Sequence, residues 1–451
     1  MTEIAFLVAL AAACVVCAFR PPLAFALVVL LFPIEQVVQA HAPRLISSAL
    51  GIQSVNYAIG LTALCAALKV TLTRPGGASR WMNAATVSAL VMLAWAAITL
   101  LWSPGRTDGL QMVAGNWPYL VLLVVLAPVL LTDVEDLRTS VQALLVLGMI
   151  LCAAVVLSPE FTSKYGRLGF SIASGVRSNP LAIGELGGVV LLVAATIRGT
   201  TLLGVPLLPL RVAAALLGVL VAIKSGSRGQ LLFAVMVSIL FVPVATPVRN
   251  VGAFISSAII IAITLFVVDF VISNQLQSYE AQRFSGESVL YGDSSAFGRV
   301  RNVTAMAGEW IRNPVAIVVG LGYNAFSQLP AAAGQPYSHV IFADAVFELG
   351  LPGLACLTIG LAVSASSAVR LWRAHAEDRT LRASVAVLVG LLAYQILLVN
   401  KQGAIWGVPM FFTFEAVVAR LWLRERDAMQ LAQEDQPDED AESDDAYAVT
   451  S

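Results

Sequence analysis

The chain is dominated by apolar stretches of about 20 residues, which follow one another with short polar breaks between them. About 20 residues of helix cross a bilayer core of roughly 30 Å, and lipid offers no partner to an unpaired backbone N–H or C=O group. A crossing segment is therefore a helix or a strand of a closed barrel, and unbroken stretches exclude the alternating pattern of barrel strands. Only 12% of the residues are charged, against about 25% in soluble proteins. We predict an all-α, polytopic integral membrane protein.

The apolar stretches predict about twelve to thirteen transmembrane helices. The expected spans are 3–19, 22–39, 55–73, 83–101, 116–132, 140–158, 180–198, 206–223, 229–246, 251–272, 340–368, 381–399 and 403–422. Basic residues of short loops favour the cytoplasm, and those of alternate loops are Arg20, Arg74, Arg80, Arg138, Arg198, Arg249, Arg370, Arg373, Arg379 and Arg382. This pattern predicts an outer N-terminus and a cytoplasmic C-terminus. The first stretch lacks a small-residue cleavage site, so we interpret it as a retained helix.

We divide the chain into four parts. Residues 1–272 are expected to form transmembrane helices, including a Ser-Arg-Gly hairpin near 225–229. Residues 273–338 are expected to form a periplasmic loop domain, and residues 339–423 the C-terminal transmembrane helices. The acidic segment 424–451 is expected to be a disordered cytoplasmic tail, either solvated or able to dock a cytoplasmic partner.

Two classes of function are disfavoured by composition. A net charge of −1 argues against nucleic acid as a partner. Of the five cysteines, Cys14 and Cys17 form a CxxC pair, but the pair lies in an expected span without a second pair or a nearby histidine. We interpret the cysteines as small apolar side chains rather than metal ligands or redox groups.

Basic residues depart from the loop pattern on the expected outer face. Lys164, Arg167 and Arg177 occur in "SKYGRLGFSIASGVRSNP", Lys224 and Arg228 in "IKSGSRGQLL", and Arg283, Arg299, Arg301 and Arg312 in the segment 273–338. Loops longer than about 12–15 residues are usually functional or disordered. The aromatic residues of this segment, Trp310, Tyr323, Phe326 and Tyr337, favour an ordered one.

Arg228 lies at the tip of an expected helical hairpin, in "KSGSRG". A permanent cation costs about 2.5–3.5 kcal/mol at the centre of a membrane helix and less near the interface. A bound anion would offset that cost, and Gly226 and Gly229 permit close approach of a phosphate to the backbone. The alternative is an arginine that reaches the lipid headgroups beside an ordinary turn glycine.

His339 is one of only three histidines. An unshifted imidazole titrates near pH 6.5, so at neutral pH it is largely free to accept a proton, as a general base must. The alternative is an interfacial residue that caps or packs a helix end. His41 and His375 are not expected near the arginine cluster, whereas His339 is expected on the same face of the membrane as that cluster.

Four segments between about 165 and 355 resemble the O-antigen ligase and O-antigen polymerase superfamily of bacterial inner-membrane glycosyltransferases. They are "GRLGFSIASGVRSNPLAIGEL", "SGSRGQLL", "SSAFGRVRNVTAMAGEWIRNPVAIVVGLGYNAF" and "SHVIFADAVFELGLPG". The family often has asparagine directly after the histidine, and this chain has Val340 there. Any role of that amide is therefore absent or filled elsewhere.

The resemblance implies a fold of the glycosyltransferase C type, in the bacterial inner membrane, with an active site that faces the periplasm. It implies a glycan donor on undecaprenyl diphosphate, an acceptor that is a glycan or lipid A-core, surrounding membrane lipid, and no cofactor or metal. A chain-length regulator and other glycan-assembly proteins are further expected partners. Arg228 and Arg299 resemble the residues that hold the diphosphate, and His339 resembles the base that activates the acceptor hydroxyl.

A second set of residues has two interpretations. Arg283, Arg301, Arg167 and Arg177 either contact phosphate and sugar or pair with nearby glutamates, and Tyr337 either stacks on a sugar or packs the loop. Asp344 and Glu348 follow His339 by five and nine residues, and neither helical spacing faces the histidine squarely. We therefore do not expect these acids to orient the imidazole directly.

Two open choices concern function. A polymerase and a ligase need the same donor and the same base, so the motifs do not separate them, and we favour a polymerase of O-antigen or exopolysaccharide repeat units. The competing classes are a transporter of lipid-linked sugar, which predicts charges near mid-membrane and an internal repeat, and a non-catalytic scaffold. The unusual charges gather at one interface, which favours chemistry there.

Overall fold

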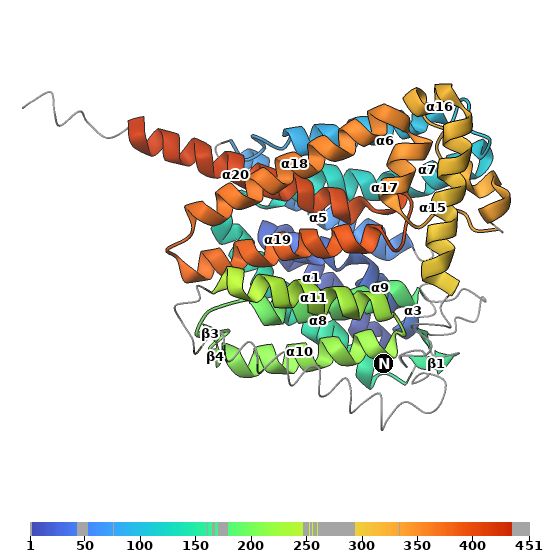
Figure 1. The fold of residues 1–451 in the computed structure, drawn as a ribbon. Coiled ribbons are helices and arrows are strands. Elements are labelled where there is room, and N and C mark those ends of the chain that lie inside the picture. The colour runs from blue at the N-terminus through green and yellow to red at the C-terminus, as the bar shows by residue number, and fades with distance from the viewer. Residues whose placement is uncertain are drawn as a thin grey trace, which may run out of the picture.

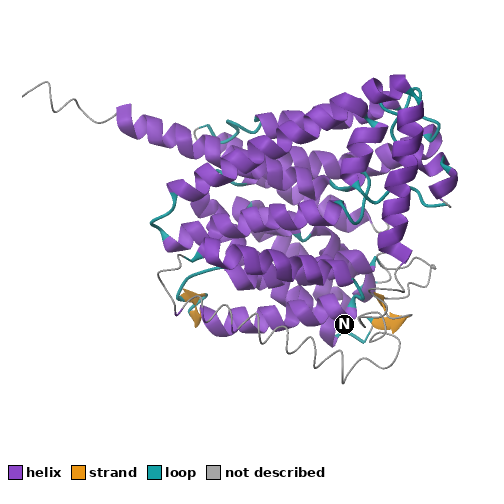
Figure 2. Cartoon of the chain, viewed as in Figure 1, coloured by secondary structure: helices purple, strands orange, loops and turns teal. Residues whose placement is uncertain are grey.

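Most helices of the computed structural model run side by side along a common direction, and helix is by far the main secondary structure (Figure 1, Figure 2). The structure describes residues 2–42, 53–74, 76–159, 161–164, 167–169, 179–246, 294–332 and 334–434, together with residues 252, 255 and 259. The helices of its first half are α1 (Thr2–Ala18), α2 (Pro21–Val29), α3 (Leu31–His41), α5 (Gln53–Thr73), α6 (Ala84–Thr99), α7 (Arg106–Leu120), η1 (Val121–Leu126), η2 (Ala127–Leu130), α8 (Val134–Leu157), α9 (Pro180–Thr196), α10 (Leu207–Lys224) and α11 (Arg228–Ala245). Those that follow are α15 (Ser294–Arg312), α16 (Pro314–Val319), η3 (Ala325–Gln328), η4 (Pro330–Ala332), α17 (Ile341–Ala343), η5 (Asp344–Glu348), α18 (Gly350–Ala374), α19 (Arg379–Val399), η6 (Ile405–Gly407) and α20 (Pro409–Glu434).

Two small antiparallel strand pairs accompany the helices. β1 (Thr162–Lys164) pairs with β2 (Arg167–Gly169), and β3 (Thr201–Leu202) pairs with β4 (Val205–Pro206). Figure 2 shows the two pairs near opposite ends of the bundle. The all-α prediction therefore holds for the described segments that are long and apolar enough to cross a membrane.

The chain is a multi-pass membrane protein. Among the residues that the structure describes, six helical stretches are long and apolar enough to cross a bilayer, namely Gln53–Thr73, Arg106–Leu130, Val134–Leu157, Leu207–Lys224, Gly350–Ala374 and Arg379–Val399. The count rises to 7 if α2 and α3, which meet at an angle of 70°, form one bent span. Four shorter apolar helices accompany them, Leu7–Ala18, Ala84–Thr99, Pro180–Thr196 and Gly229–Ala245.

The described residues contain fewer full-length spans than the twelve to thirteen predicted, because several apolar stretches are broken or shifted. The expected span 22–39 breaks at Leu30, where Pro33 cannot continue the helix that ends at Val29. The expected span 340–368 begins only at Gly350, which has a φ of 67° that interrupts the helix. The expected span 251–272 lies almost wholly outside the described residues.

Helices α9 and α10 pack at a distance that only glycine allows. A Cβ atom built on Gly187 would lie 2.4 Å from the carbonyl oxygen of Gly218, and one on Gly218 would lie 2.7 Å from the carbonyl oxygen of Gly187. Without a hydrophobic driving force between helices in lipid, such close backbone contact is a main source of packing energy.

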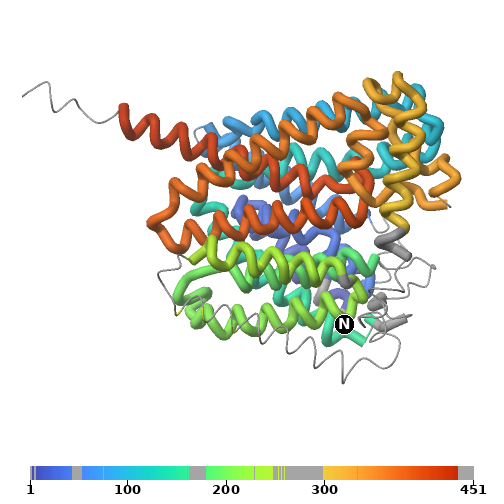
Figure 3. Tube along the Cα trace, viewed as in Figure 1, coloured from blue at the N-terminus to red at the C-terminus, as the bar shows by residue number. Residues whose placement is uncertain are grey.

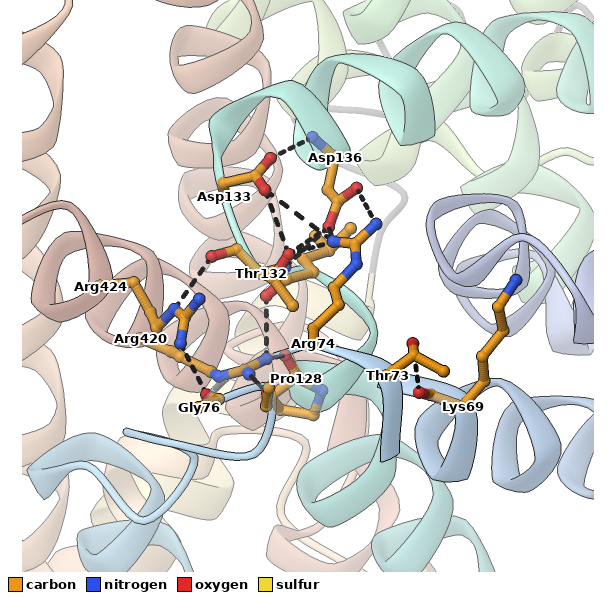
Figure 4. A network of polar contacts seen from close by, with 12 residues as sticks. Lys69, Thr73, Arg74, Gly76, Pro128, Thr132, Asp133, Asp136, Arg420 and Arg424 are labelled. Carbon is orange, nitrogen blue, oxygen red and sulfur yellow. Dashed lines mark hydrogen bonds and ion pairs between the residues drawn. The ribbon is translucent and has the colours of Figure 1, made fainter. Parts of the chain in front are cut away.

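A buried arginine joins three parts of the chain at one end of the bundle. Arg420 of α20 is fully buried, and its guanidinium donates to the backbone carbonyls of Gly77, Pro128 and Leu131 (Figure 4). Beside it, Arg424 donates to the carbonyls of Gly76 and Thr132. These bonds connect α20 to the α5–α6 loop and to the turn that precedes α8.

The predicted start of the disordered tail at 424 is wrong, because α20 continues to Glu434. Besides the bonds of Arg424, Asp427 pairs with Arg80 at 2.8 Å, and this hydrogen bond lowers the pKa of the Asp427 carboxyl. Contacts with distant loops therefore order a segment whose own composition favours disorder. Figure 3 shows this part of α20 projecting beyond the rest of the bundle.

We expect Gly187→Ala to destabilise the protein, because the new methyl group would collide with the α10 backbone. Overpacking of this kind costs about 1–3 kcal/mol, which a lower unfolding temperature in detergent would reveal. Gly60→Ala is the matched control, since a Cβ at Gly60 in α5 meets nothing within 4 Å. Equal unfolding temperatures for the two variants would contradict this account of the α9–α10 contact.

Candidate functional site

The segment 294–349 lies at one end of the bundle, where α15 runs across the ends of the membrane helices (Figure 1, Figure 3). The turn between α10 and α11 lies at the same end. Of the residues expected in the site, the structure describes the side chains of His339, Arg299, Arg301 and Tyr337. For Arg228 and Arg167 it describes the backbone alone, and Arg177 and Arg283 lie outside the described residues.

His339 occupies an exceptional backbone conformation. Its φ of 71° lies in the left-handed region, which costs a residue other than glycine free energy and is commonest at functional sites. The imidazole is half-buried, and its ring meets the Tyr337 ring edge to face with centroids 4.5 Å apart. Neither ring nitrogen has a hydrogen-bond partner among the residues that the structure describes. The ring is therefore held by its backbone and by Tyr337, with both nitrogens available to a ligand.

A buried serine and a buried aspartate fix the backbone on either side of His339. The Ser338 hydroxyl donates to the Asp344 carboxylate and accepts a hydrogen bond from the Val340 N–H at 3.0 Å. Asp344 is fully buried, and burial raises the pKa of its carboxyl. Asp344 therefore acts on the His339 backbone through Ser338 rather than on the imidazole, in agreement with the helical spacing.

Glu348 joins the Gly-x-Gly loop to the helix that follows the histidine. Its carboxylate accepts the N–H groups of Asn324 at 2.9 Å and Phe326 at 3.0 Å. A Cβ on Gly320 would lie 2.0 Å from the Glu348 carbonyl oxygen, so the loop approaches as closely as glycine permits. Burial, followed by the charge of Asp344, raises the pKa of Glu348. Two motifs of the sequence, "GLGYNAF" and "FELG", thus form one contact.

Arg299 brings a positive charge to His339. It is half-buried in α15, and its guanidinium donates to the Lys401 carbonyl at 3.4 Å. Burial is the larger cause that lowers the pKa of His339, and the charge of Arg299 is the second. Both effects favour the neutral form of the imidazole.

The tip of the hairpin formed by α10 and α11 contacts the side chain of Lys401. A Cβ on Gly229 would lie 2.4 Å from the Lys401 side chain, and the Lys401 ammonium donates to Gln230 at 3.0 Å. Gln230 in turn donates to Gln402 at 2.8 Å. The loop between α19 and α20 thus lies between the hairpin that carries Arg228 and the helix that carries Arg299.

The hairpin tip is also fixed to the start of α9. Gly226 supplies the turn with a φ of 66°, and a Cβ on Gly184 would lie 2.8 Å from the Ser227 Cβ. Asn179, before the first proline of α9, caps the helix by accepting the N–H of Leu181 at 3.0 Å. The Asn-Pro and Ser-Arg-Gly motifs therefore lie against each other.

The other expected residues have different surroundings. Arg301 is exposed and, two residues after Arg299, projects about 200° away from it around the helix axis. Trp310 packs, as its nitrogen donates to the Ala316 carbonyl at 2.8 Å and its ring meets Phe347. Tyr337 contacts His339, and burial raises the pKa of its hydroxyl. In the described part of the chain, no group of three or more His, Cys, Asp and Glu side chains is arranged to hold a metal ion.

Sequence reasoning missed Lys401, Gln230 and Gln402. The signal for Lys401 was present, because "NKQG" is a polar break with a basic residue on the expected outer face. Gln230 lies at the start of an apolar stretch, where a single amide is typical of an ordinary interfacial residue and does not indicate a functional one.

Comparison with known proteins finds structural similarity only at low sequence identity. No family model matches the sequence, and no curated protein matches it either. Among solved structures, a chain from work on "Structural coordination of polymerization and crosslinking by a peptidoglycan synthase complex" aligns with a TM-score of 0.44 at 19% identity, over 77% of this chain and 98% of that one. A similarity this distant leaves the function to be argued from the residues of this chain.

We expect His339→Gly to be more stable than His339→Ala by about 1 kcal/mol, because glycine adopts a positive φ without the strain that alanine suffers there. Thermal unfolding of the two variants measures the difference, and both lack the imidazole. Leu203, exposed and with a φ of 54°, offers the same pair of substitutions at a distant turn. Equal stability of the His339 pair, with the expected difference at Leu203, would show that the His339 backbone relaxes freely.

We expect Arg299→Gln to raise the pKa of His339, since the charge of Arg299 is one of the two causes that lower it. The imidazole would then gain its proton at a higher pH than in the native protein. An NMR titration of labelled histidine checks this, with His41 and His375 replaced by glutamine to leave one signal. Arg312→Gln, on the same helix and exposed, is the control. An unchanged titration in Arg299→Gln would mean that solvent screens the two groups from each other.

Proposed function

We propose that this protein transfers a glycan from an undecaprenyl-diphosphate donor to a sugar hydroxyl at the periplasmic face of the bacterial inner membrane. The observation that carries the proposal is the environment of His339. Its imidazole has a lowered pKa, two nitrogens free of protein hydrogen bonds among the described residues, and a neighbouring arginine charge. A neutral base beside fixed cations suits the removal of a proton next to a departing phosphate.

In the proposed reaction, the acceptor oxygen forms a bond to the anomeric carbon of the donor. The bond between that carbon and the diphosphate oxygen breaks, and its electron pair leaves with the lipid diphosphate. His339 takes the proton of the acceptor hydroxyl. No oxidant, reductant or nucleotide is consumed, because the energy comes from the cleaved glycosyl phosphate bond.

The cations of the site have a clear task in this reaction. Negative charge grows on the bridging oxygen as the diphosphate leaves, and a charge-assisted hydrogen bond from a guanidinium is about twice as strong as a neutral one. We assign this task to Arg299 and Arg228. Lys401 adds a third positive group, because its side chain lies close to the Gly229 backbone and donates to Gln230. Its backbone carbonyl accepts the hydrogen bond of Arg299.

The buried acids act as supports. Glu348 holds the Gly-x-Gly loop and Asp344 holds Ser338, so both carboxylates are occupied by protein donors. Their raised pKa values suit groups kept away from solvent. We therefore assign no proton transfer with the substrate to either acid.

Within glycan transfer we favour polymerisation of O-antigen or exopolysaccharide repeat units, with ligation of a finished glycan to lipid A-core as the alternative. A transporter would need charged groups near mid-membrane that are reached from both sides. Here Arg299, Lys401 and His339 share one end of the bundle. That location supports chemistry at one face rather than passage through the protein.

The proposal is tested by deleting the gene and separating the surface glycans on a gel. Single repeat units on the lipid A-core would indicate a lost polymerase, whereas an undecorated core with long lipid-linked chains would indicate a lost ligase. Complementation with Arg299→Lys should restore little, because losing one well-placed donor costs about 2.7–4 kcal/mol, or roughly 100- to 1,000-fold in rate. His339→Ala should restore none.

Arg312→Lys is the matched control for Arg299→Lys, because Arg312 is exposed on the same helix and pairs only with Glu309 among the described residues. It should complement fully. Unchanged glycans in the deletion strain, or full complementation by His339→Ala at normal protein levels, would overturn the proposal.

A further inference from the structure

A cavity of about 710 Å³ lies among α1, α2, α5 and α8, at the end of the bundle where the arginine network of Figure 4 joins α20 to the loops. Its polar lining comes from Arg20, Lys69, Arg74, Asp136, Thr73 and Thr139. Three cations therefore face one carboxylate. The reaction proposed above uses none of these residues.

The three cations differ in how many of their hydrogen-bond donors already have partners in the protein. Arg74 forms hydrogen bonds with the Asp136 carboxylate and with Thr132, so its charge is largely balanced. The Lys69 ammonium donates one of its three hydrogens to the Phe19 carbonyl at 2.7 Å. The guanidinium of Arg20 is exposed and has no polar partner among the residues that the structure describes. Lys69 and Arg20 thus retain donors for an anion.

Figure 4 shows how the cations of α5 are presented. The side chain of Lys69 in α5 and that of Arg74, directly after α5, extend in the same direction, and Arg74 reaches Asp136 of α8. Arg20 joins them from the turn between α1 and α2. Cations from different elements of the chain therefore surround one space.

The rim of the cavity is apolar and exposed. Val16 in the last turn of α1 and Phe19 just after it line the cavity, and these residues are 54% and 64% exposed. In a membrane protein such side chains face lipid. The cavity therefore offers cations and a lipid-facing apolar wall side by side, which is the pattern that an anionic amphiphile would match.

We propose that this cavity binds the phosphate of an anionic phospholipid, with Lys69 and Arg20 donating to the phosphate oxygens and Val16 and Phe19 beside the first part of the acyl chains. A free phosphate shares the anion chemistry but gains nothing from the apolar wall. The charges also suit the leaflet on which the arginine-rich loops are expected, because anionic headgroups attract basic residues near the membrane surface.

The test uses the purified full-length protein in neutral detergent, titrated with phosphatidylglycerol, phosphatidylcholine or inorganic phosphate. Native mass spectrometry counts the bound lipids, and the unfolding temperature reports stabilisation by binding. We expect phosphatidylglycerol to bind best. Arg20→Gln should weaken that binding about fivefold, since one basic residue near the surface contributes about 1 kcal/mol. Arg20→Gln removes no side-chain hydrogen bond or ion pair among the described residues, so we expect the variant to fold.

Two further variants locate the effect. Arg20→Gln combined with Lys69→Gln should weaken phosphatidylglycerol binding about 25-fold if each cation contributes equally. Arg373→Gln combined with Arg379→Gln removes two exposed cations that do not line the cavity and should leave the binding unchanged. An equal loss in this control would show general attraction between lipid and protein and would overturn the site. Equal binding of phosphatidylcholine would do the same, and equal stabilisation by inorganic phosphate would overturn the lipid assignment.

Discussion

Inside a membrane, every charged group and every backbone group without a helical partner must be satisfied by the protein itself. This structure meets that constraint with single buried side chains that each form hydrogen bonds with several backbone groups. Arg420 donates to carbonyls from two loops at one end of the bundle, and Glu348 accepts from two N–H groups at the other. Both are buried ionisable residues whose removal would leave more than one backbone group unpaired.

The same constraint explains the division of roles around His339. Asp344 accepts a hydrogen bond from the Ser338 hydroxyl and Glu348 accepts two from backbone N–H groups, and among the described residues neither acid is hydrogen-bonded to the imidazole. The histidine is then fixed by its left-handed backbone and by the edge of Tyr337. A proton acceptor for an external substrate requires a fixed backbone and a side-chain nitrogen that the protein does not already hydrogen-bond.

The sequence predicts features that depend on composition and local chemistry, and it misses those that depend on distant contacts. Hydrophobicity is enough to identify an all-α membrane protein, and the order of the motifs around Gly184, Gly229, Gly320 and Glu348 anticipates segments that lie in contact. Hydrophobicity does not reveal that Pro33 divides a span or that Arg424 and Asp427 order the end of α20, because a proline break and a loop partner leave mean hydropathy unchanged. Lys401 was missed for the related reason that its role comes from two segments more than a hundred residues away.

Under the proposed function, the effect of Arg299 on the pKa of His339 changes when the donor binds. In the free protein its charge, after burial, helps to lower the pKa of His339 and so favours the neutral imidazole. A bound diphosphate would neutralise much of that charge, because opposite charges a few ångströms apart cancel most of each other's field. The pKa of His339 would then rise, and a neutral imidazole with a higher pKa is a stronger base. On this argument the arginine keeps the base unprotonated until the leaving group is in place, and the arrival of the leaving group then strengthens the base.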